Sequence, residues 1–328
     1  MQNNIQIVDL EIGKNIEGCF YVLKEFERKI SRQEKPYFNV KLGDKSGEIR
    51  GKLWSLPAGM TEQSLSVGDI VVVSGLIQEY NGAPQIMINS IEKATGAAPE
   101  DFLPITSRNR GDMAHALEVE IEKTQNPHLK KLLQTFWQNQ ELKDKFANFP
   151  AAEYVHHGYV GGLIEHVYEM NEMTKPFLSL YPNLDRDLLF AGLFFHDIGK
   201  LEELDIVGAT FVRTTEGKLV AHIGQGLLMV DRMVTQIPDF PQLLRDKLYH
   251  LILSHQGELE FGSPIKPQML EAMVLSFIDN NSAFMNQAVK HIEKNIHTGD
   301  HFTDYHKWLG RSLWQGDYLP NLGNQDSE

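Results

Sequence analysis

The sequence predicts a multidomain protein in which a small all-β barrel precedes an all-α domain. Short alternating apolar runs separated by turn residues fill the first 95 positions, and this pattern is typical of β-strands. From Asp112 onward, apolar residues recur every three or four positions, as in helices. A connector containing proline and glycine separates the two patterns. We therefore expect a barrel over 1–95, a linker over 96–111, a helical domain over 112–315 and a tail over 316–328.

Five segments of the first domain are predicted to be strands. They cover residues 18–24, 35–42, 48–54, 69–75 and 85–91. Five short strands are typical of a small closed barrel. The turn-rich loop over 43–47 makes the second and third segments a hairpin. Alternation along this hairpin places one face toward the barrel interior, and that face comprises Phe38, Val40, Leu42, Ile49 and Leu53.

The other face of this hairpin combines aromatic rings with cations. It comprises Tyr37, Asn39, Lys41, Arg50, Lys52 and Trp54. Rings stack on bases and cations neutralise phosphates, and an OB-fold uses this part of its barrel to bind single-stranded nucleic acid. We expect nucleic-acid contacts from Tyr37, Lys41, Arg50, Lys52 and Trp54. The simpler alternative is that the cations are merely solvated and that the two rings cap the barrel.

The overall charge argues against a protein that coats nucleic acid through electrostatics alone. The chain of 328 residues has a formal net charge of −13, whereas affinity for phosphate backbones comes mainly from lysine and arginine. Residues 1–95 contain 11 basic and 12 acidic residues, and the remainder contains 20 and 32. The first domain can therefore present a local basic face.

Apolar segments and cysteine content restrict the compartment and the metal chemistry. No apolar stretch is long enough to span a bilayer, and none follows an N-terminal cluster of positive charge, so we expect a cytoplasmic protein without a membrane partner. Cys19 is the single cysteine, which excludes an internal disulfide and a thiolate cluster. A metal site would use imidazole and carboxylate ligands, which favour manganese, magnesium, iron or zinc.

Two potential metal ligands stand side by side at the end of an apolar run. His196 and Asp197 directly follow the predicted helix over 188–195. A buried imidazole beside a buried carboxylate needs a counter-charge, and a divalent cation would provide one. The run therefore predicts a metal site at this pair.

Four further residues complete a possible ligand set. Each lies on or at the end of a predicted helix with apolar neighbours at helical spacing, and they are His166, His222, His255 and Asp279. One histidine on a helix is more often a core or surface group than a ligand. The order His, His-Asp, His, His, Asp, together with the string HDIGK at 196–200, resembles the HD superfamily of metal-dependent phosphohydrolases.

The succession of a barrel and an HD-like domain is similar to the YhaM family of 3′-to-5′ exoribonucleases. Further resembling strings lie at 35–38 (KPYF), 44–49 (DKSGEI), 52–54 (KLW), 156–166, 181–192, 262–264 and 278–280. The resemblance implies an OB-fold joined to an HD domain. It also implies manganese-dependent removal of nucleotides from single-stranded RNA ends, with some activity on single-stranded DNA.

Phosphodiester hydrolysis needs the phosphate charge neutralised, a water activated and the leaving oxygen stabilised, and one or two divalent ions meet all three needs. We expect the first ion at His166, His196, Asp197 and Asp279. Asp197 has two oxygens and can bridge two ions. Lys200 follows Asp197 by three residues and is expected to neutralise the phosphate, so Asp197 and Lys200 are the candidate catalytic residues.

A second ion would be held by Asp197, His222 and His255. One departure puts it in doubt, because related dinuclear HD enzymes tend to have His-His where this chain has His255 followed by Gln256. Glutamine is a poor metal ligand. With a single ion, His222 and His255 would instead hold the phosphate or donate a proton to the leaving group.

Two other functions are compatible with these residues. One is an HD phosphohydrolase acting on a small nucleotide, such as a cyclic dinucleotide, a nucleoside triphosphate or an alarmone. The Gly-Tyr-Pro string of cyclic-dinucleotide enzymes is absent, and Gly262-Ser-Pro264 stands near the comparable place. The other is a non-catalytic nucleic-acid-binding module, which the full ligand set disfavours.

A homo-oligomer is compatible with the sequence, and a short hairpin is expected over 209–220.

Overall fold

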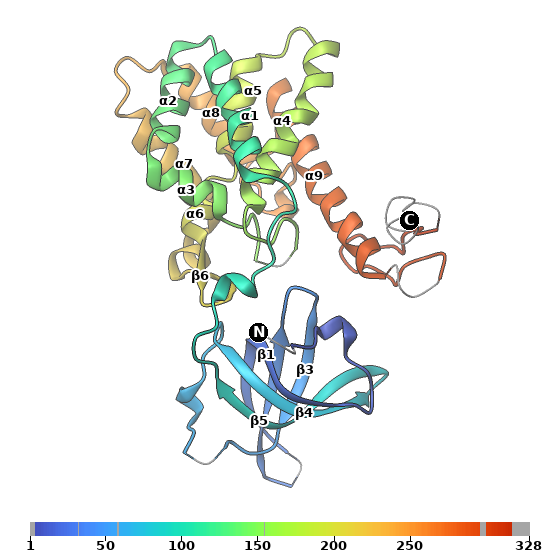
Figure 1. Cartoon of the computed structure of the whole chain (residues 1–328). Coiled ribbons are helices and arrows are strands. Elements are labelled where there is room, and N and C mark those ends of the chain that lie inside the picture. The colour runs from blue at the N-terminus through green and yellow to red at the C-terminus, as the bar shows by residue number, and fades with distance from the viewer. Residues whose placement is uncertain (1–3, 32, 58, 154, 296–299, 317–328) are drawn as a thin grey trace. The chain divides into compact units, whose positions relative to one another are not determined.

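The chain forms two compact units (Figure 1). The computed structural model describes residues 4–31, 33–57, 59–153, 155–295 and 300–316. One unit contains the residues up to Ile105 together with Leu204–Arg213, and the other contains Thr106–Glu203 and the residues from Thr214 onward. The first is a closed β-barrel and the second is mainly helical, which confirms the predicted fold class. Of the predicted tail, residues 317–328 lie outside the described residues.

Five strands close the barrel in the order β1-β2-β3-β5-β4. They are β1 (Asn15–Ile30), β2 (Pro36–Gly43), β3 (Glu48–Leu53), β4 (Ile70–Tyr80) and β5 (Ala83–Lys93). Each predicted strand corresponds to one of these, although β1 and β4 extend well beyond the predicted segments. β1 is long enough to pair with both β2 and β4, and β3 closes the barrel by pairing in parallel with β5.

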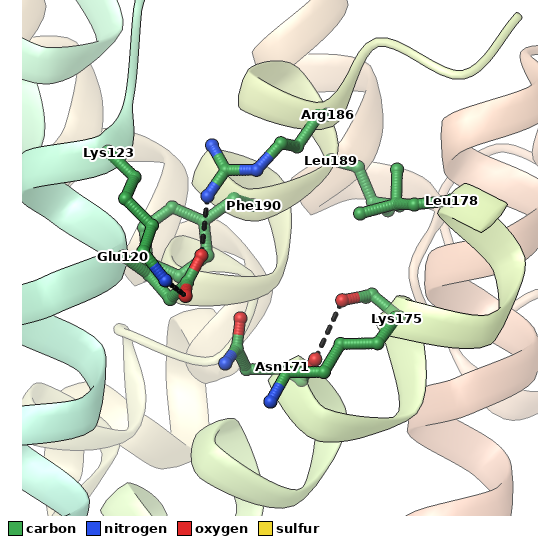
Figure 2. A pocket seen from close by; sticks show the side chains of 9 residues that line it. Glu120, Lys123, Asn171, Lys175, Leu178, Arg186, Leu189 and Phe190 are labelled. Carbon is green, nitrogen blue, oxygen red and sulfur yellow. Dashed lines mark hydrogen bonds and ion pairs between the residues drawn. The ribbon is translucent and has the colours of Figure 1, made fainter. Parts of the chain in front are cut away.

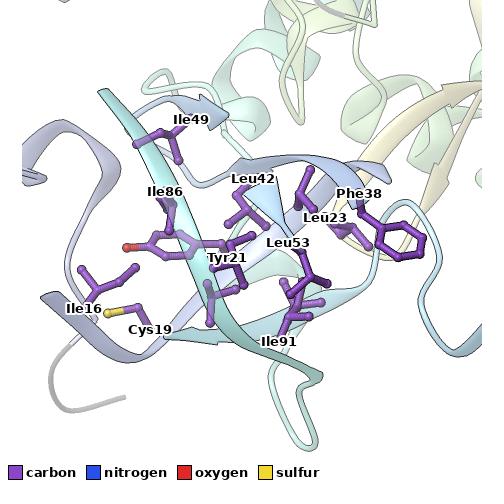
Figure 3. Close-up of a cluster of buried hydrophobic side chains, with 14 of the residues drawn as sticks. Ile16, Cys19, Tyr21, Leu23, Phe38, Leu42, Ile49, Leu53, Ile86 and Ile91 are labelled. Carbon is purple, nitrogen blue, oxygen red and sulfur yellow. The ribbon is translucent and has the colours of Figure 1, made fainter. Parts of the chain in front are cut away.

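The barrel core is apolar and follows the predicted alternation. Phe38, Leu42 and Leu53 are buried, and Figure 3 shows Leu42 and Leu53 in the same core as Tyr21, with Phe38 at one end of the cluster. Close packing between β4 and β5 also requires glycine at position 75. A Cβ atom at Gly75 would lie 2.4 Å from the carbonyl oxygen of Met87, so the adjacent backbones of β4 and β5 leave no room for a side chain.

A two-stranded hairpin, β6 (Leu204–Val207) and β7 (Thr210–Arg213), belongs to the barrel unit although its sequence interrupts the helical unit. The backbone N–H of Ala209 donates to the carbonyl of Gly68 at 3.0 Å. A Cβ atom at Gly208 would lie 2.2 Å from the same carbonyl oxygen. The hairpin predicted over 209–220 was wrong in its bounds, because the Thr214 side chain caps a helix that takes up the following residues.

Nine helices are described in the second unit. They are α1 (Arg110–Lys123), α2 (Pro127–Trp137), α3 (Gln140–Asn148), α4 (Gly162–Leu180), α5 (Arg186–Phe195), α6 (Lys200–Glu203), α7 (Thr215–Val234), α8 (Gln242–Ser254) and α9 (Leu270–Asn295). Side-chain caps from Asn109, Asn126 and Asn139 begin the first three helices. Short 3₁₀ helices lie at Ile7–Asp9, Glu62–Ser64, Pro99–Asp101 and Leu259–Phe261.

The helical core surrounds α5, which packs against α2, α4, α8 and α9. All residues of Asp187–Phe195 are buried, and the rings of Phe136 and Phe194 meet edge to face at 5.4 Å. Across the described residues, no helix is both long enough and apolar enough to cross a membrane.

Candidate metal centre

The end of α5 sets the position of the His-Asp pair. His196 follows the last residue of this buried helix and is itself fully buried, and Asp197 is 3% exposed. Gly192 allows α5 to approach α8, since a Cβ atom there would lie 2.6 Å from Leu251 Cδ1. The close approach brings the ring of His196 to 5.0 Å from the ring of His255, which follows the end of α8.

One group of potential ligands contains His166 from α4, His196 and Asp197, whose ligand atoms all lie within 4.8 Å of one another. His166 Nε2 is 3.3 Å from His196 Nε2, and His196 Nε2 is 3.6 Å from Asp197 Oδ2. Asp279 from α9 adjoins this group, with its Oδ1 atom 3.1 Å from His166 Nε2. Two helices, α4 and α9, and the end of a third, α5, thus converge on one volume.

A second group contains Asp197, His222 and His255. Asp197 Oδ1 lies 3.4 Å from His222 Nε2 and 3.8 Å from His255 Nε2. Asp197 therefore belongs to both groups, with Oδ2 near His196 and Oδ1 near the second pair of histidines. This is the arrangement of a carboxylate that can bridge two cations.

Two atoms of the second group fit a bound cation. Asp197 Oδ1 and His222 Nε2 are buried and have no hydrogen-bond partner among the described residues. An unsatisfied buried polar atom costs about 1–3 kcal/mol, and more when it is charged. A divalent cation between the two atoms would satisfy both, and oxygen and nitrogen donors suit such an ion.

The Nδ1 atoms of His196 and His255 are each fixed by a hydrogen bond to the backbone. His196 Nδ1 donates to the carbonyl of Leu193 at 2.8 Å, and His255 Nδ1 donates to the carbonyl of Ile252 at 2.6 Å. With Nδ1 protonated, a neutral ring carries its lone pair on Nε2, which faces the centre. The backbone thus selects the tautomer that can bind a metal.

His166 is held through a hydroxyl and a carboxylate. Ser282 Oγ lies 3.0 Å from His166 Nδ1 and donates to Glu169 Oε2 at 3.0 Å, and Glu169 also contacts His157 Nε2 at 3.1 Å. Ser282 stands three residues after Asp279 and shares its face of α9. This spacing is a signal in the sequence that would have indicated Ser282.

His222 is positioned by its backbone and by a carboxylate. Ala221 interrupts α7 with φ 57° and ψ 166°, a region that is almost confined to glycine. A Cβ atom at Gly199 would lie 1.9 Å from the carbonyl oxygen of His222. The His222 Nδ1 atom is 3.3 Å from Glu203 Oε2. The sequence reasoning missed both Glu203 and the role of Gly199 within the HDIGK string.

Burial and neighbouring charges set the protonation of the centre. Burial and the adjacent His196 lower the pKa of His255 to about 4, and burial likewise lowers the pKa of His196. Burial lowers the pKa of His166 too, but the hydrogen bond and charge of Asp279 outweigh it and raise that pKa above its usual value. Burial raises the pKa of Asp197, yet Lys200 and the imidazoles lower it well below normal. The centre thus keeps its carboxylates ionised.

Lys200 lies at the edge of the centre, and its side chain is 10% exposed. Its Nζ atom is 3.6 Å from Glu203 Oε2, so the ammonium shares this carboxylate with His222. The positive charge of Lys200 also helps to lower the pKa of Asp197.

The barrel carries a separate cluster of rings around one ammonium group. Lys52 Nζ lies 5.0, 5.6 and 5.4 Å from the ring centroids of Tyr37, Trp54 and Tyr80, and the last two residues are half exposed. Tyr80 was not predicted, because it stands alone at the end of β4. Its position beside the Asn81-Gly82 turn is the signal that places it on a hairpin.

Lys41 and Arg50 lie opposite each other on β2 and β3. Lys41 is not part of the aromatic cluster, because its Nζ atom is 2.6 Å from Glu48 Oε2 and 3.9 Å from Glu25 Oε1. Arg50 is exposed. The structure therefore joins Tyr37, Lys52 and Trp54 and separates Lys41 from them.

A pocket between α1, α4 and α5 contains none of the predicted site residues. Figure 2 shows Arg186 and Lys123 directed at the carboxylate of Glu120, and Lys175 at the opposite wall is paired with Glu172 at 2.5 Å. Its cations are therefore already neutralised within the protein.

Comparisons with known proteins match both units. The family model described as OB-fold nucleic acid binding domain matches residues 24–94, and the HD domain model matches residues 163–283. A protein of Geobacillus sp. (strain WCH70) named 3′-5′ exoribonuclease YhaM is 35% identical over 88% of each chain. Proteins of the same name are 32% identical in Oceanobacillus iheyensis, over 95% of this chain and 97% of that one, and in Bacillus subtilis (strain 168), over 87% and 90%.

Among solved structures, a domain of replication protein A from Methanococcus maripaludis covers 28% of this chain and 94% of its own, with a TM-score of 0.24 and 24% identity. The proteins named YhaM match this chain over 87–95% of its length, and they confirm the family resemblance expected from the sequence. This chain belongs to the YhaM family, with an OB-fold nucleic acid binding domain followed by an HD domain.

Proposed function

We propose that the protein is a metal-dependent 3′-to-5′ exoribonuclease that hydrolyses the phosphodiester bonds of single-stranded RNA, and also of single-stranded DNA. The observation that carries the proposal is the pair of ligand groups that share Asp197 in a chain of the YhaM family. A cytoplasmic location, which is compatible with an RNA substrate, is part of the proposal. The domain limits of 1–95 and 112–315, with a linker over 96–111, are part of the proposal.

Two cation positions are assigned from the ligand groups. His166, His196, Asp197 and Asp279 would hold the first ion. Asp197, His222 and His255 would hold the second. When bound, a divalent cation would act as a Lewis acid that neutralises phosphate charge. It would also lower the pKa of a bound water. We propose Mn²⁺ as the ion, and an assay with Mg²⁺, Fe²⁺ and Zn²⁺ compares the alternatives.

The second position is expected to bind more weakly than the first. Gln256 Nε2 lies 3.1 Å from His255 Nε2 and donates to the lone pair that a cation would need. A second ion therefore has to displace this amide. Asp197 links the two positions, and Lys200 is assigned to the negative charge of the scissile phosphate.

The barrel would bind the strand from which nucleotides are removed. Tyr37, Trp54 and Tyr80 provide faces for base stacking, and Lys52 lies among them as a cation for the phosphate chain. Arg50 is exposed and available to a phosphate, and Lys41 would first have to leave Glu48. This surface has no evident use in an enzyme that hydrolyses a free small nucleotide.

The test is digestion of a 5′-labelled single-stranded RNA in Mn²⁺, with products resolved by length. The matched control is a His196→Ala/Asp197→Ala variant whose circular dichroism equals that of the wild type. A ladder that shortens from the 3′ end in the wild type alone supports the proposal. Intact RNA together with hydrolysis of a small nucleotide would overturn it in favour of the small-nucleotide enzyme. RNA binding without any turnover would favour a binding module.

A further inference from the structure

α9 has two apolar faces, and within the described residues one is buried and the other is largely exposed. Its inner face packs against α4, α5 and α8 and contains buried Leu275 and Ile278. Large side chains on the outer face are 38–62% exposed, and they are Leu270, Met273, Phe277, Phe284 and Met285. The spacing of three, four and seven residues among the first four places them in one stripe along the helix.

The segment over 300–316 adds exposed aromatic rings. Phe302, Tyr305, Trp308 and Trp314 are 56%, 66%, 77% and 46% exposed. The segment lies beside the C-terminal half of α9 (Figure 1), where the rings of His291 and His306 are 4.6 Å apart. The stripe on α9 and these four rings are named the outer apolar surface.

The two parts of the outer apolar surface are continuous. The guanidinium carbon of Arg311 lies 5.6 Å from the ring centroid of Phe284, so the segment reaches the stripe itself. Exposed apolar patches of this extent on a soluble protein mark an interaction site.

The charges favour an apolar partner over a nucleic acid. In the segment, Lys307 and Arg311 are balanced by Asp300 and Asp304. The stripe on α9 consists of uncharged side chains, and the whole chain has a net charge of −13. Binding to nucleic acid requires a surplus of cations, which this surface does not provide.

The area is sufficient for a stable dimer. A large aromatic side chain buries about 150–250 Å² when it is fully covered. With the observed exposures, the outer apolar surface offers on the order of 1,000 Å², compared with about 800 Å² per partner in a standard interface. One partner of ordinary size would cover it.

We propose that a second copy of this chain covers the outer apolar surface, with α9 packed against α9 about a two-fold axis. A two-fold dimer uses the same patch on both subunits and is the commonest symmetric assembly. The spacing of the stripe provides the ridge that helix packing requires. The opposite face of the same helix presents Asp279 to the candidate metal centre. The dimer would therefore stabilise a helix that carries one of the candidate ligands.

The test is sedimentation velocity of the full chain at micromolar concentrations. Wild-type protein is expected to sediment with twice the mass of the 37.3 kDa chain. Phe277→Glu and Trp308→Ser are expected to give monomers, and Leu243→Glu, which changes a side chain 68% exposed on α8, is expected to stay dimeric. Trp308 contributes little to the core because it is 77% exposed, so its variant separates dissociation from misfolding, which circular dichroism verifies.

A second measurement uses a single reactive thiol. Cys19 is buried, so a Met273→Cys variant carries one thiol that is accessible in the monomer and lies within the proposed interface, where a bismaleimide added while the chains exchange can join it to the thiol of the second copy. We expect covalent dimers at high yield, and their loss when Phe277→Glu is added. A wild-type monomer at 100-fold higher concentration would overturn the proposal. So would a dimer that persists in both surface variants, or a loss of RNA binding in Trp308→Ser without any change in mass.

Discussion

Glu203 Oε2 lies 3.3 Å from His222 Nδ1, and Glu203 is the last residue of α6 and 1% exposed. A buried carboxylate on the far nitrogen of a metal-binding imidazole fixes the ring and raises its basicity. Glu203 thus does for His222 what the carbonyls of Leu193 and Ile252 do for His196 and His255. The neighbouring Glu202 is exposed and has no such role.

Replacing Glu203 by glutamine is expected to weaken the second ion position. Removal of such a supporting carboxylate commonly costs 10- to 100-fold in metal affinity. The measurement is Mn²⁺ titration by calorimetry, in which the weaker of two binding steps should shift while the tighter step stays. Glu202→Gln is the matched control. Equal affinities in Glu203→Gln and wild type would contradict this role of the carboxylate.

Gln256→His is expected to strengthen the same position. The side-chain amide of Gln256 donates a hydrogen bond to His255 Nε2 at 3.1 Å. A histidine at position 256 would offer a lone pair to the cation instead of this amide. Activity should then reach saturation at lower Mn²⁺ concentration. Gln256→Ala is the informative comparison, because it removes the competing amide without adding a ligand and should produce part of the effect. Weaker activation by Mn²⁺ in both variants would argue that Gln256 supports the centre.

Metal binding is expected to depend on pH through His166. Its pKa is raised in the metal-free protein, since the hydrogen bond and charge of Asp279 outweigh burial. The charged ring therefore contributes stability below its unfolded pKa, and this contribution is lost as pH rises through the folded pKa. A cation binds the neutral ring and must displace the proton.

The gain in thermal stability produced by Mn²⁺ should therefore increase between pH 5.5 and 8.5. His255 has a pKa of about 4, so it is already neutral over this range and adds no slope. Differential scanning fluorimetry with Mn²⁺ or with chelator measures the difference at each pH. A gain that is constant across the range would show that His166 carries no proton there.

Tyr80→Ala is expected to weaken RNA binding while leaving hydrolysis at the metal centre unchanged. Loss of one stacking ring costs about 1–3 kcal/mol, so KM for a single-stranded RNA should rise about 5- to 150-fold. The kcat for a dinucleotide should not change. Tyr181, which is 56% exposed in the helical unit, compares with Tyr80 at 54%, so Tyr181→Ala is the control. Equal KM values in the two variants would remove Tyr80 from the RNA-binding surface.

The sequence was sufficient to predict those elements that local interactions or a strong apolar pattern determine. Alternation along 38–53 gave the inward face of the barrel, and the apolar run before His196 gave α5. Glu203 and Tyr80 were missed because each acts through a partner distant in the chain or through tertiary packing. Thr214 was missed as a helix cap because the strand-like run around Phe211 and Val212 continued into residues that form the first turn of α7.

Ala221→Gly is expected to stabilise the helical unit. The backbone at Ala221, with φ 57° and ψ 166°, costs an L-residue about 1–3 kcal/mol, whereas glycine loses about 0.4–1 kcal/mol through the unfolded chain. The net gain in the free energy of unfolding is about 1 kcal/mol. The control Ala114→Gly lies within α1 and should have the opposite sign, with a cost of about 1 kcal/mol. Urea denaturation of the two variants measures both values. If both variants lost stability equally, Ala221 would not be strained, and the orientation of His222 would depend on Glu203 and Gly199.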